Sequence, residues 1–283
     1  MQIFRERALL QREISRLKQK KNTIGFVPTM GALHQGHLSL VRQAAEVCDA
    51  IVVSIFINPT QFDNLKDLEN YPRTLDSDIA LLEELHLNLL IFTPNAAELY
   101  GKEIHATHFD FGGIEHEMEG KYRTGHFNGV GTVVKRLFEI IQPDKAFFGE
   151  KDYQQLLIIR KLNEKENLGV EIIGCPIERE DTGLARSSRN DRLSTNSRKE
   201  AAFIYQILLK VKEKFGIENA DDIKTWVENE FKNHADLKLE YFEIADSRTL
   251  KSGKNNDKKS TYRAFIAAYA QEVRLIDNIA LNY

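Results

Sequence analysis

The chain has 283 residues, 42% of them apolar and 29% charged, which is the composition of a globular protein with one large domain or two ordinary ones. Its net charge of −3 and pI near 6.3 exclude a general basic attraction to nucleic acid, although a local positive pocket for a small anion is compatible with both values. Cys48 and Cys175 have no metal-ligand spacing, residues 1–17 lack the apolar core of a secretion signal, and no apolar run approaches the roughly 20 residues of a membrane span. We therefore expect two buried thiols in a cytoplasmic protein.

Helical and strand patterns alternate through the first 176 residues. Residues 3–18 carry a rough helical stripe, and the apolar runs at 23–28 and 50–57 are typical of buried strands. Further helical patterns cover 38–48, 76–84, 129–141 and 153–163, and further strand patterns cover 87–92, 144–148 and 170–175. This alternation predicts an α/β fold with a Rossmann-like, doubly wound parallel sheet.

The pattern changes after Pro176, so we expect domains at 1–176 and 177–283. A polar stretch leads into one long helix over 197–215, and a second helix is expected over 221–234. Strand patterns at 239–245, 264–270 and 273–276 return over short intervals, which favours a small antiparallel sheet. The C-terminal domain is therefore expected to be α+β, with residues 251–260 forming a solvated hairpin tip.

The segment between the first buried strand and the following helix carries two histidines, His34 and His37. A helix N-terminus at the carboxyl end of a parallel sheet attracts phosphate through its N–H groups and dipole. Gly31 and Gly36 permit close approach of the backbone, and the two imidazoles can donate hydrogen bonds to one anion. The candidate phosphate site comprises Met30, Gly31, Ala32, Leu33, His34, Gln35, Gly36 and His37.

Three more segments carry candidate chemistry. Hydroxyl and guanidinium groups at Arg186, Ser187, Ser188 and Arg189 suit a loop that closes over a triphosphate. A turn after the strand at 144–148 holds Gly149, Glu150, Lys151 and Asp152, where the lysine can neutralise phosphate charge and the aspartate can accept a ribose hydroxyl or orient the lysine. The amides of Asn58 and Gln61, beside phenylalanines, suit a small hydroxylated acid with an alkyl body.

Other templates are absent from the sequence. There is no Walker A loop, and no Gly-x-Gly-x-x-Gly follows the first buried strand. His105, His108 and His116 form no recognised ligand set. We therefore expect no metal held by protein ligands, and expect Mg²⁺ only as the companion of ATP.

Taken together, these segments resemble the pantoate–β-alanine ligase family, a branch of the His-x-Gly-His nucleotidylyl transferases. Six blocks stand in the family's order and spacing, and they span residues 28–190. They are the block that ends in His34–His37, the Asn58–Gln61 block, Tyr71–Thr74, Arg123–His126, Gly149–Gln155 and Ser187–Asn190.

The resemblance implies a reaction in which ATP and pantoate form pantoyl adenylate, which β-alanine then attacks to give pantothenate and AMP. It implies that His34, His37 and Lys151 are catalytic, with His37 as proton donor, and that Gly149–Asp152 and Arg186–Arg189 contact ATP. It assigns pantoate to Gln61 and Gln155, and β-alanine to Gln61. It further implies a homodimer, an ATP- and pantoate-binding first domain and a lid-like second domain, but no individual roles for Arg123 and His126.

Two positions depart from the family pattern, which usually has apolar residues there. They are Glu178 and Arg186, both on the adenine side of the expected ATP site. We hypothesise that the two charges compensate each other.

Two other classes of protein share part of these features. A nucleotidylyl transferase that adenylates a phosphate would share the arrangement of a strand, the His34–His37 turn and a helix, but it would not need the amides of Asn58 and Gln61. A catalytically silent nucleotide-binding module would have a damaged site, whereas both histidines, Lys151 and Arg189 are present. An aminoacyl-tRNA synthetase is disfavoured because the chain lacks room and basic charge for a tRNA-binding domain.

Overall fold

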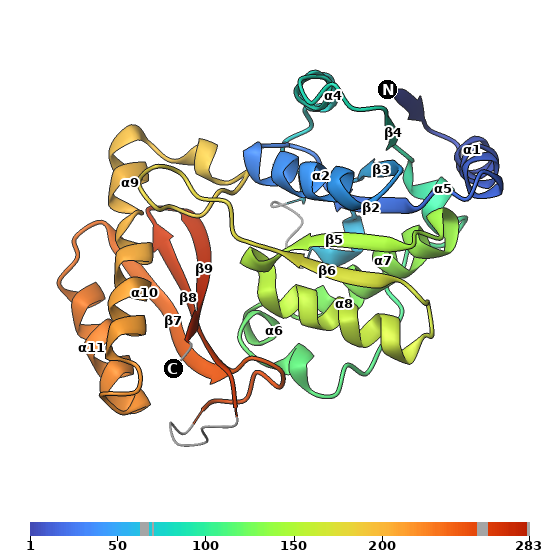
Figure 1. Ribbon diagram of the computed structural model, residues 1–283. Coiled ribbons are helices and arrows are strands. Elements are labelled where there is room, and N and C mark those ends of the chain that lie inside the picture. Colours follow the sequence, from blue (N-terminus) through green and yellow to red (C-terminus); the bar gives the residue numbers. More distant parts are fainter. Residues whose placement is uncertain (63–67, 70, 254–259, 282–283) are drawn as a thin grey trace. The chain divides into compact units, whose positions relative to one another are not determined.

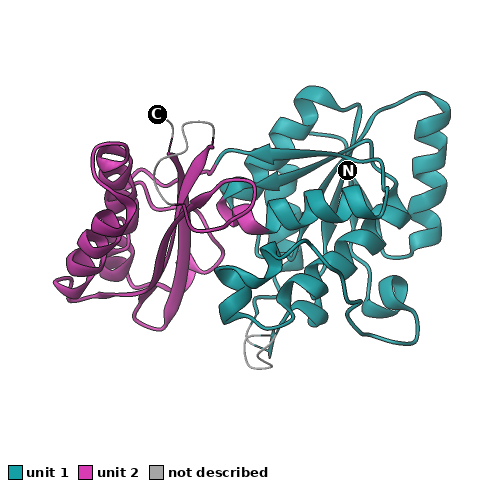
Figure 2. Ribbon diagram, turned by 90° about the horizontal axis from the view of Figure 1, so that it is seen from below, with its two compact units in different colours: residues 1–150, 155–176 teal, residues 151–154, 177–283 magenta. Residues whose placement is uncertain are grey.

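The computed structural model describes residues 1–62, 68–69, 71–253 and 260–281, and its chain divides into two compact units (Figure 2). Unit 1 comprises Met1–Glu150 and Gln155–Pro176. Unit 2 comprises Lys151–Gln154 and Ile177–Tyr283. The segment Lys151–Gln154 therefore belongs to the C-terminal unit, although its sequence neighbours on both sides belong to unit 1.

Unit 1 contains a six-stranded parallel sheet in the order β1-β4-β3-β2-β5-β6 (Figure 1). Its strands are β1 (Gln2–Phe4), β2 (Ile24–Thr29), β3 (Ala50–Ile55), β4 (Leu89–Phe92), β5 (Lys145–Gly149) and β6 (Glu171–Cys175). Its helices are α1 (Arg7–Gln19), α2 (Gln35–Val47), η1 (Pro59–Gln61), α4 (Leu75–Glu83), α5 (Ala96–Tyr100), η2 (Ile114–His116), α6 (Glu119–Tyr122) and α7 (His126–Ile141). Two further helices, η3 (Glu150–Asp152) and α8 (Tyr153–Lys165), cross the unit boundary. The predicted doubly wound parallel sheet is thus confirmed.

The strand order reverses direction between β2 and β5. From β2 the chain winds outward through α2 and α4 to β3 and β4, and α7 then carries it back across the sheet to β5. Right-handed crossovers place α2 and α4 on one face of the sheet and α1, α7 and α8 on the other (Figure 1). Ligands of such sheets bind where the order reverses, at the carboxyl ends of the strands. This point is the end of β2, where α2 begins.

The central strands are apolar because helices cover both of their faces. In β3 the residues Ala50–Ser54 are all buried, and β4 is buried throughout. Phe147 and Cys175 join the same core cluster from β5 and β6, and burial raises the pKa of the Cys175 thiol to about 11. Cys48 is only partly buried, so the expectation of two buried thiols holds for Cys175 alone.

Two elements differ from the sequence expectations. The helical stripe assigned to residues 3–18 starts instead at Arg7, because Gln2–Phe4 pair with β4 as an edge strand. The long helix expected over 197–215 is two helices, since hydrogen bonds tighten to an i→i−3 pattern at Ala202, Ile204 and Tyr205.

Unit 2 has a three-stranded antiparallel sheet in the order β7-β8-β9, which confirms the predicted α+β character. Its elements are η4 (Asn190–Arg192), α9 (Thr195–Glu200), α10 (Phe203–Lys214), α11 (Ala220–Lys232), β7 (Leu237–Asp246), β8 (Tyr262–Ala270) and β9 (Val273–Leu281). Apolar side chains of α10, α11 and the sheet form one core, which includes Leu208, Val227 and Ile266. Of the hairpin tip expected at 251–260, residues 254–259 lie outside the described residues.

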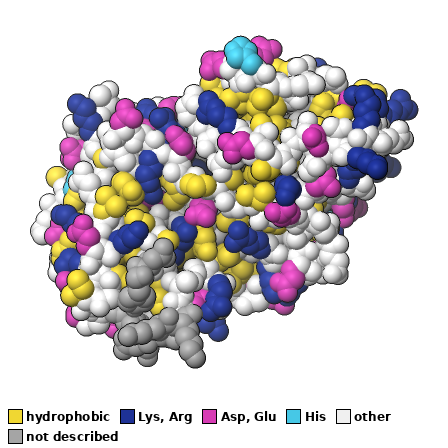
Figure 3. All heavy atoms as spheres, viewed as in Figure 1, with side chains coloured by type: hydrophobic (Ala, Val, Ile, Leu, Met, Phe, Trp, Pro, Cys, Tyr) yellow, Lys and Arg dark blue, Asp and Glu magenta, His cyan; other side chains and the backbone are white. Residues whose placement is uncertain are grey.

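The structure also bears on membrane-spanning helices and on the distribution of surface charge. In the described ranges no helix combines the length and apolarity needed to cross a membrane. On the face seen in Figure 3, lysine and arginine side chains are interspersed with aspartate and glutamate. That face therefore carries no single-sign field of the kind that draws in a polyanion.

Candidate active site

The N-terminus of α2 is built from its two histidines. His34 is the N-cap, and its Nδ1 accepts the Gly36 N–H at 3.1 Å, while His37 Nδ1 accepts the His34 N–H at 3.3 Å. The two rings lie 4.1 Å apart between centroids. Because each Nδ1 accepts a hydrogen bond, the neutral rings carry their protons on Nε2. The structure thus brings together two imidazole N–H donors at the switch point of the sheet.

Asp78 holds the turn that precedes these histidines. Gly31 and Ala32 both have positive φ, +84° and +49°, and the Asp78 carboxylate accepts the N–H groups of Ala32 at 3.1 Å and Leu33 at 2.7 Å. Thr74 donates its hydroxyl to the same carboxylate at 3.2 Å, and Asp78 is only 2% exposed. A carboxylate from α4 therefore stabilises a left-handed turn that a non-glycine residue rarely adopts.

Asp78 is not among the residues that the sequence pattern predicts for the site. A signal was available, because Asp78 lies four residues before the buried Leu82 and so shares the buried face of its helix. A charged residue at such a position needs partners, since burying an unpaired carboxylate is costly.

Gln61 is held in place beside the same turn. Its Nε2 donates to the sulfur of Met30 at 3.0 Å, and its Oε1 accepts the Asn58 Nδ2 at 3.0 Å. Asn58 also donates to the Gly129 carbonyl at 3.1 Å, and its Oδ1 accepts the Thr60 N–H and the Tyr100 hydroxyl. These contacts use both donors and both acceptor positions of the Asn58 amide, which is 1% exposed. They hold Asn58 against Gln61, and its direct contact with an acid stays a prediction.

Helix α7 supports Gln61 from the other side. His126 Nδ1 lies 2.9 Å from the Gln61 carbonyl oxygen. A Cβ added at Gly129 would stand 2.2 Å from the Thr60 carbonyl oxygen, so only glycine permits this approach of α7 to η1. His126 thus shapes the Gln61 segment through the backbone, a role that the sequence left unassigned.

The turn after β5 carries Lys151 and Asp152. Lys151 Nζ lies 3.9 Å from Asp152 Oδ2, and the two side chains are 18% and 50% exposed. At this distance and exposure the pair orients the lysine only weakly. Gln155 follows in the first turn of α8, half-buried, and in the described part of the chain its amide makes no hydrogen bond.

The Ser187–Arg189 segment continues from a small hairpin in unit 2. Arg179 and Ala185 form its bridge, and the Arg186 N–H donates to the Glu178 carbonyl at 2.9 Å. Within the described chain the two residues are joined through their backbones and form no ion pair, and the hypothesis that their charges compensate each other across the nucleotide site stays a prediction. The charge of Arg186 acts on Glu180, and its Nε is buried without a hydrogen-bond partner among the described residues.

Glu180 fastens this hairpin to the helix that follows. Arg198 donates to it in a bidentate pair, with Nε 2.9 Å from Oε2 and Nη2 2.7 Å from Oε1. Asn190 Nδ2 donates both to Glu180 Oε1 and to the Ala185 carbonyl, each at 3.0 Å. Burial would raise the pKa of Glu180, but the bonds from Arg198 and Asn190 and the charges of Arg198 and Arg186 lower it. The Ser187–Arg189 segment is thereby held at both ends.

Replacing Glu180 by glutamine is expected to lower the free energy of unfolding by about 1–2 kcal/mol at neutral pH, a value reduced by the partial exposure of Arg198. Because the pKa of Glu180 is lower in the folded state, its contribution is complete above the usual carboxyl pKa near 4 and is lost as pH falls through the lowered value. Urea unfolding of wild type and Glu180→Gln at several pH values tests this. A difference in stability that is independent of pH would contradict it.

The predicted residues are distributed over both units. Unit 1 contains Met30, Gly31, Ala32, Leu33, His34, Gln35, Gly36, His37, Asn58, Gln61, Gly149, Glu150 and Gln155. Unit 2 contains Lys151, Asp152, Glu178, Arg186, Ser187, Ser188 and Arg189. Among the described residues, no group of three or more His, Cys, Asp or Glu side chains is arranged to hold a metal ion.

Known proteins are similar to this chain in sequence and in fold over almost its whole length. The sequence model of the family described as pantoate-beta-alanine ligase matches residues 2–280. The pantothenate synthetases of Christiangramia forsetii and Flavobacterium psychrophilum are 62% and 48% identical over 282 residues, covering 100% of both chains in each case.

Solved structures agree with the sequence comparisons. A pantothenate synthetase from Thermus thermophilus is 38% identical with a TM-score of 0.91, covering 100% of both chains. A pantoate-beta-alanine ligase from Francisella tularensis, in complex with beta-gamma ATP and beta-alanine, is 36% identical with a TM-score of 0.81, covering 99% of this chain and 97% of that one.

Proposed function

The chain belongs to the pantoate-beta-alanine ligase family and is therefore a ligase, and from this premise we propose that it forms pantothenate in two steps through a pantoyl adenylate. In the first step a pantoate carboxylate oxygen attacks the α-phosphorus of ATP, and the bond to the β-phosphate bridge breaks to release pyrophosphate. In the second step the amine of β-alanine attacks the acyl carbon, loses a proton and displaces AMP. Neither step requires a covalent bond to the enzyme.

One contact carries this proposal. Gln61 Nε2 lies 3.0 Å from the sulfur of Met30, which belongs to the phosphate turn. A residue suited to hold a hydroxylated acid therefore adjoins the turn suited to hold phosphates. Adenylation needs such proximity, because positioning two reactants converts a slow bimolecular step into an intramolecular one. We propose that Gln61 and Gln155 hold pantoate, that Gln61 also lies at the β-alanine site, and that Asn58 supports Gln61.

The ATP side of the proposal rests on N–H donors and cations. His34 and His37 offer Nε2–H groups to the phosphates, which become more negative as pyrophosphate leaves. Lys151 and Arg189 supply positive charge, and Gly149–Asp152 and Arg186–Ser188 are the remaining proposed ATP contacts. Mg²⁺ enters as part of the nucleotide substrate.

Product analysis tests the proposal directly. Purified protein with Mg·ATP, pantoate and β-alanine should release AMP and pantothenate in equal amounts, and omission of either acid should abolish steady AMP release. With pantoate alone, one equivalent of pyrophosphate per site is expected, because the adenylate then has no acceptor. A dinucleotide-type product formed from a phosphate substrate would favour a nucleotidylyl transferase of the other type. ATP binding without any turnover would favour a silent module.

The oligomeric part of the proposal is a homodimer. It rests on the family alone. Light scattering of the purified chain should give about twice the 32.5 kDa of one chain, and a monomer mass at assay concentration would refute it.

A further inference from the structure

Two adjacent polar side chains are buried in the edge strand β9. Asp277 is 4% exposed and Asn278 is 2% exposed. Successive strand residues point to opposite faces of a sheet, so the two side chains face opposite ways. Buried polar groups cost several kcal/mol unless their hydrogen bonds are made. The hydrogen-bond partners of Asp277 and Asn278 therefore decide whether their burial destabilises the fold.

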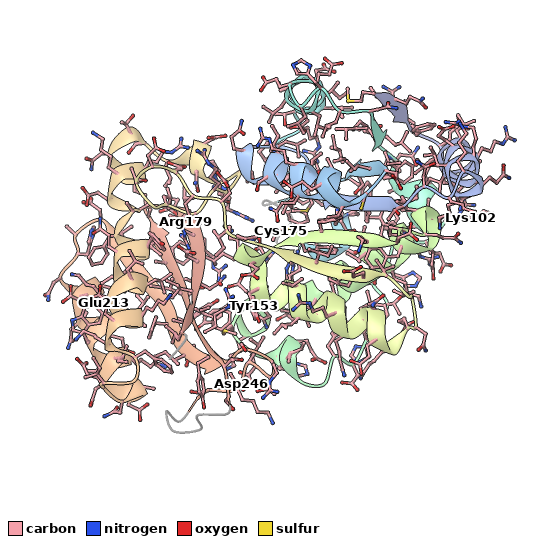
Figure 4. All side chains as sticks on the ribbon, in the orientation of Figure 1. Lys102, Tyr153, Cys175, Arg179, Glu213 and Asp246 are labelled. Atoms are coloured by element: carbon pink, nitrogen blue, oxygen red, sulfur yellow. The ribbon has the colours of Figure 1, made fainter. Side chains whose placement is uncertain are left out.

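Asp277 holds the hairpin that leads to Ser187–Arg189. Arg179 donates to it in a bidentate pair, with Nη1 2.6 Å from Oδ2 and Nη2 2.9 Å from Oδ1. The same guanidinium donates to the Gly183 carbonyl at 3.0 Å and lies 3.7 Å from the ring centroid of Tyr205 (Arg179 is labelled in Figure 4). One buried carboxylate thus fixes both arms of the hairpin to the sheet.

Asn278 holds the Lys151 turn. Its Nδ2 donates to the Lys151 carbonyl oxygen at 2.9 Å, and its Oδ1 accepts a hydrogen bond from Arg263. Arg263 stacks 4.0 Å from the ring centroid of Tyr153, which is labelled in Figure 4. The segment Lys151–Gln154 therefore has its anchors in the sheet of unit 2, consistent with its membership of that unit.

The two anchors are connected to each other. The Asn278 N–H donates to Asp277 Oδ1 at 2.7 Å, the same oxygen that accepts from Arg179 Nη2. Burial raises the pKa of Asp277, whereas Arg179, the Asn278 N–H and the charge of Lys151 act in the opposite direction.

We propose that Asp277 and Asn278 are positioning residues that hold Lys151 and the Ser187–Arg189 segment in fixed register for the triphosphate of ATP. The inference rests on the proposed function, because it assumes that both segments contact ATP. Its physical basis is that a displacement of about 1 Å in a charged group can lower a rate about a hundredfold. A strand with anchors on both faces prevents such displacement of either segment.

Asn278→Asp is the sharpest variant. The aspartate keeps an acceptor for Arg263 but has no donor for the Lys151 carbonyl, so the turn loses its anchor while the cation keeps its partner. We expect kcat for AMP release to fall tenfold or more, with KM for ATP changed less than threefold. If this variant does not fold, Asn278→Ser removes the same long donor with less charge perturbation, and the same result is expected.

The matched control is Glu240→Gln, which weakens a half-buried ion pair with Arg274 in the same sheet, away from both segments. Trp226, the single tryptophan of the chain, packs on the core of unit 2 and reports unfolding of both variants. We expect Glu240→Gln and Asn278→Asp to lose similar amounts of thermal stability, but we expect kcat to be unchanged in Glu240→Gln. Loss of stability with unchanged kcat in the Asn278 variants would overturn the inference, since it would make the pair merely structural.

A double-mutant cycle gives the decisive readout. In a Lys151→Ala background, Asn278→Asp should lower kcat by less than twofold further, because the group that it positions is already gone. Full multiplication of the two losses would overturn the inference. Wild-type turnover in the same assay separates the proposed function from the positioning role. If the wild type shows no turnover, the proposed function fails. If the wild type turns over and the Asn278 variants keep its kcat, only the positioning role is refuted.

Discussion

The variant His37→Ala is expected to release AMP about a hundredfold more slowly than wild type, a loss of about 3 kcal/mol in transition-state stabilisation. The reason for this loss is the tautomer of the His37 ring. His37 Nδ1 accepts the His34 N–H, which places the ring proton on Nε2 and makes that atom a donor. In the proposed mechanism an Nε2–H at the start of α2 stabilises charge most when pyrophosphate leaves, so kcat should fall more than ATP affinity.

A second substitution separates catalysis from capping at this position. His37→Gln keeps an acceptor for the His34 N–H, because glutamine at the third helical position completes a capping box. We expect it to recover stability but not turnover. His105→Ala, at an exposed histidine, is the control and should stay within twofold of wild type. Rapid-quench measurement of adenylate formation at saturating pantoate checks all three variants. Unchanged turnover in His37→Ala, or full recovery in His37→Gln, would remove His37 from the chemistry.

The parts of the fold that the sequence predicts are those in which local pattern and tertiary burial agree. β3 and β4 lie under helices on both faces, so their residues form short unbroken apolar runs. β1 escapes prediction because a three-residue edge strand is too short for a period and is defined by its pairing with Leu90–Phe92. The break between α9 and α10 falls at Ala201 and Ala202, good helix formers whose local preference gives no reason for a stop.

The same distinction applies to the candidate site. His34 and His37 are recognisable because their capping bonds are local, within three residues. Asn58 could be selected from sequence as a polar residue after a strand, but its role depends on Gly129 and Tyr100, which lie 71 and 42 residues away. Sequence spacing therefore predicts which residues belong to the candidate site, but it does not separate groups bonded to distant parts of the chain from groups that could face a ligand.

Asp78→Ala is expected to lower the free energy of unfolding by about 2–4 kcal/mol and to lower AMP release at least tenfold. Two partly buried backbone N–H groups, those of Ala32 and Leu33, would lose their acceptor, and each such loss costs about 1–3 kcal/mol when the group is fully buried. Ala32, at a φ of +49°, is a strained residue that surrounding bonds must hold in place. Without the carboxylate the turn can relax, and the start of α2 with its histidines then moves relative to Gln61.

Asp76→Ala is the matched control, because it removes an exposed carboxylate from the first turn of the same helix and should change stability by less than about 0.5 kcal/mol. Asp78→Asn should fall between the two, since one acceptor is retained and the other becomes a donor facing an N–H group. Urea unfolding followed by circular dichroism gives the stabilities, and the AMP assay at saturating substrates gives the rates. A variant that loses stability but keeps its full rate would show that the turn holds its catalytic geometry without Asp78. Asp78 would then contribute to stability alone, and the capping bonds of His34 and His37 would be enough to order the start of α2.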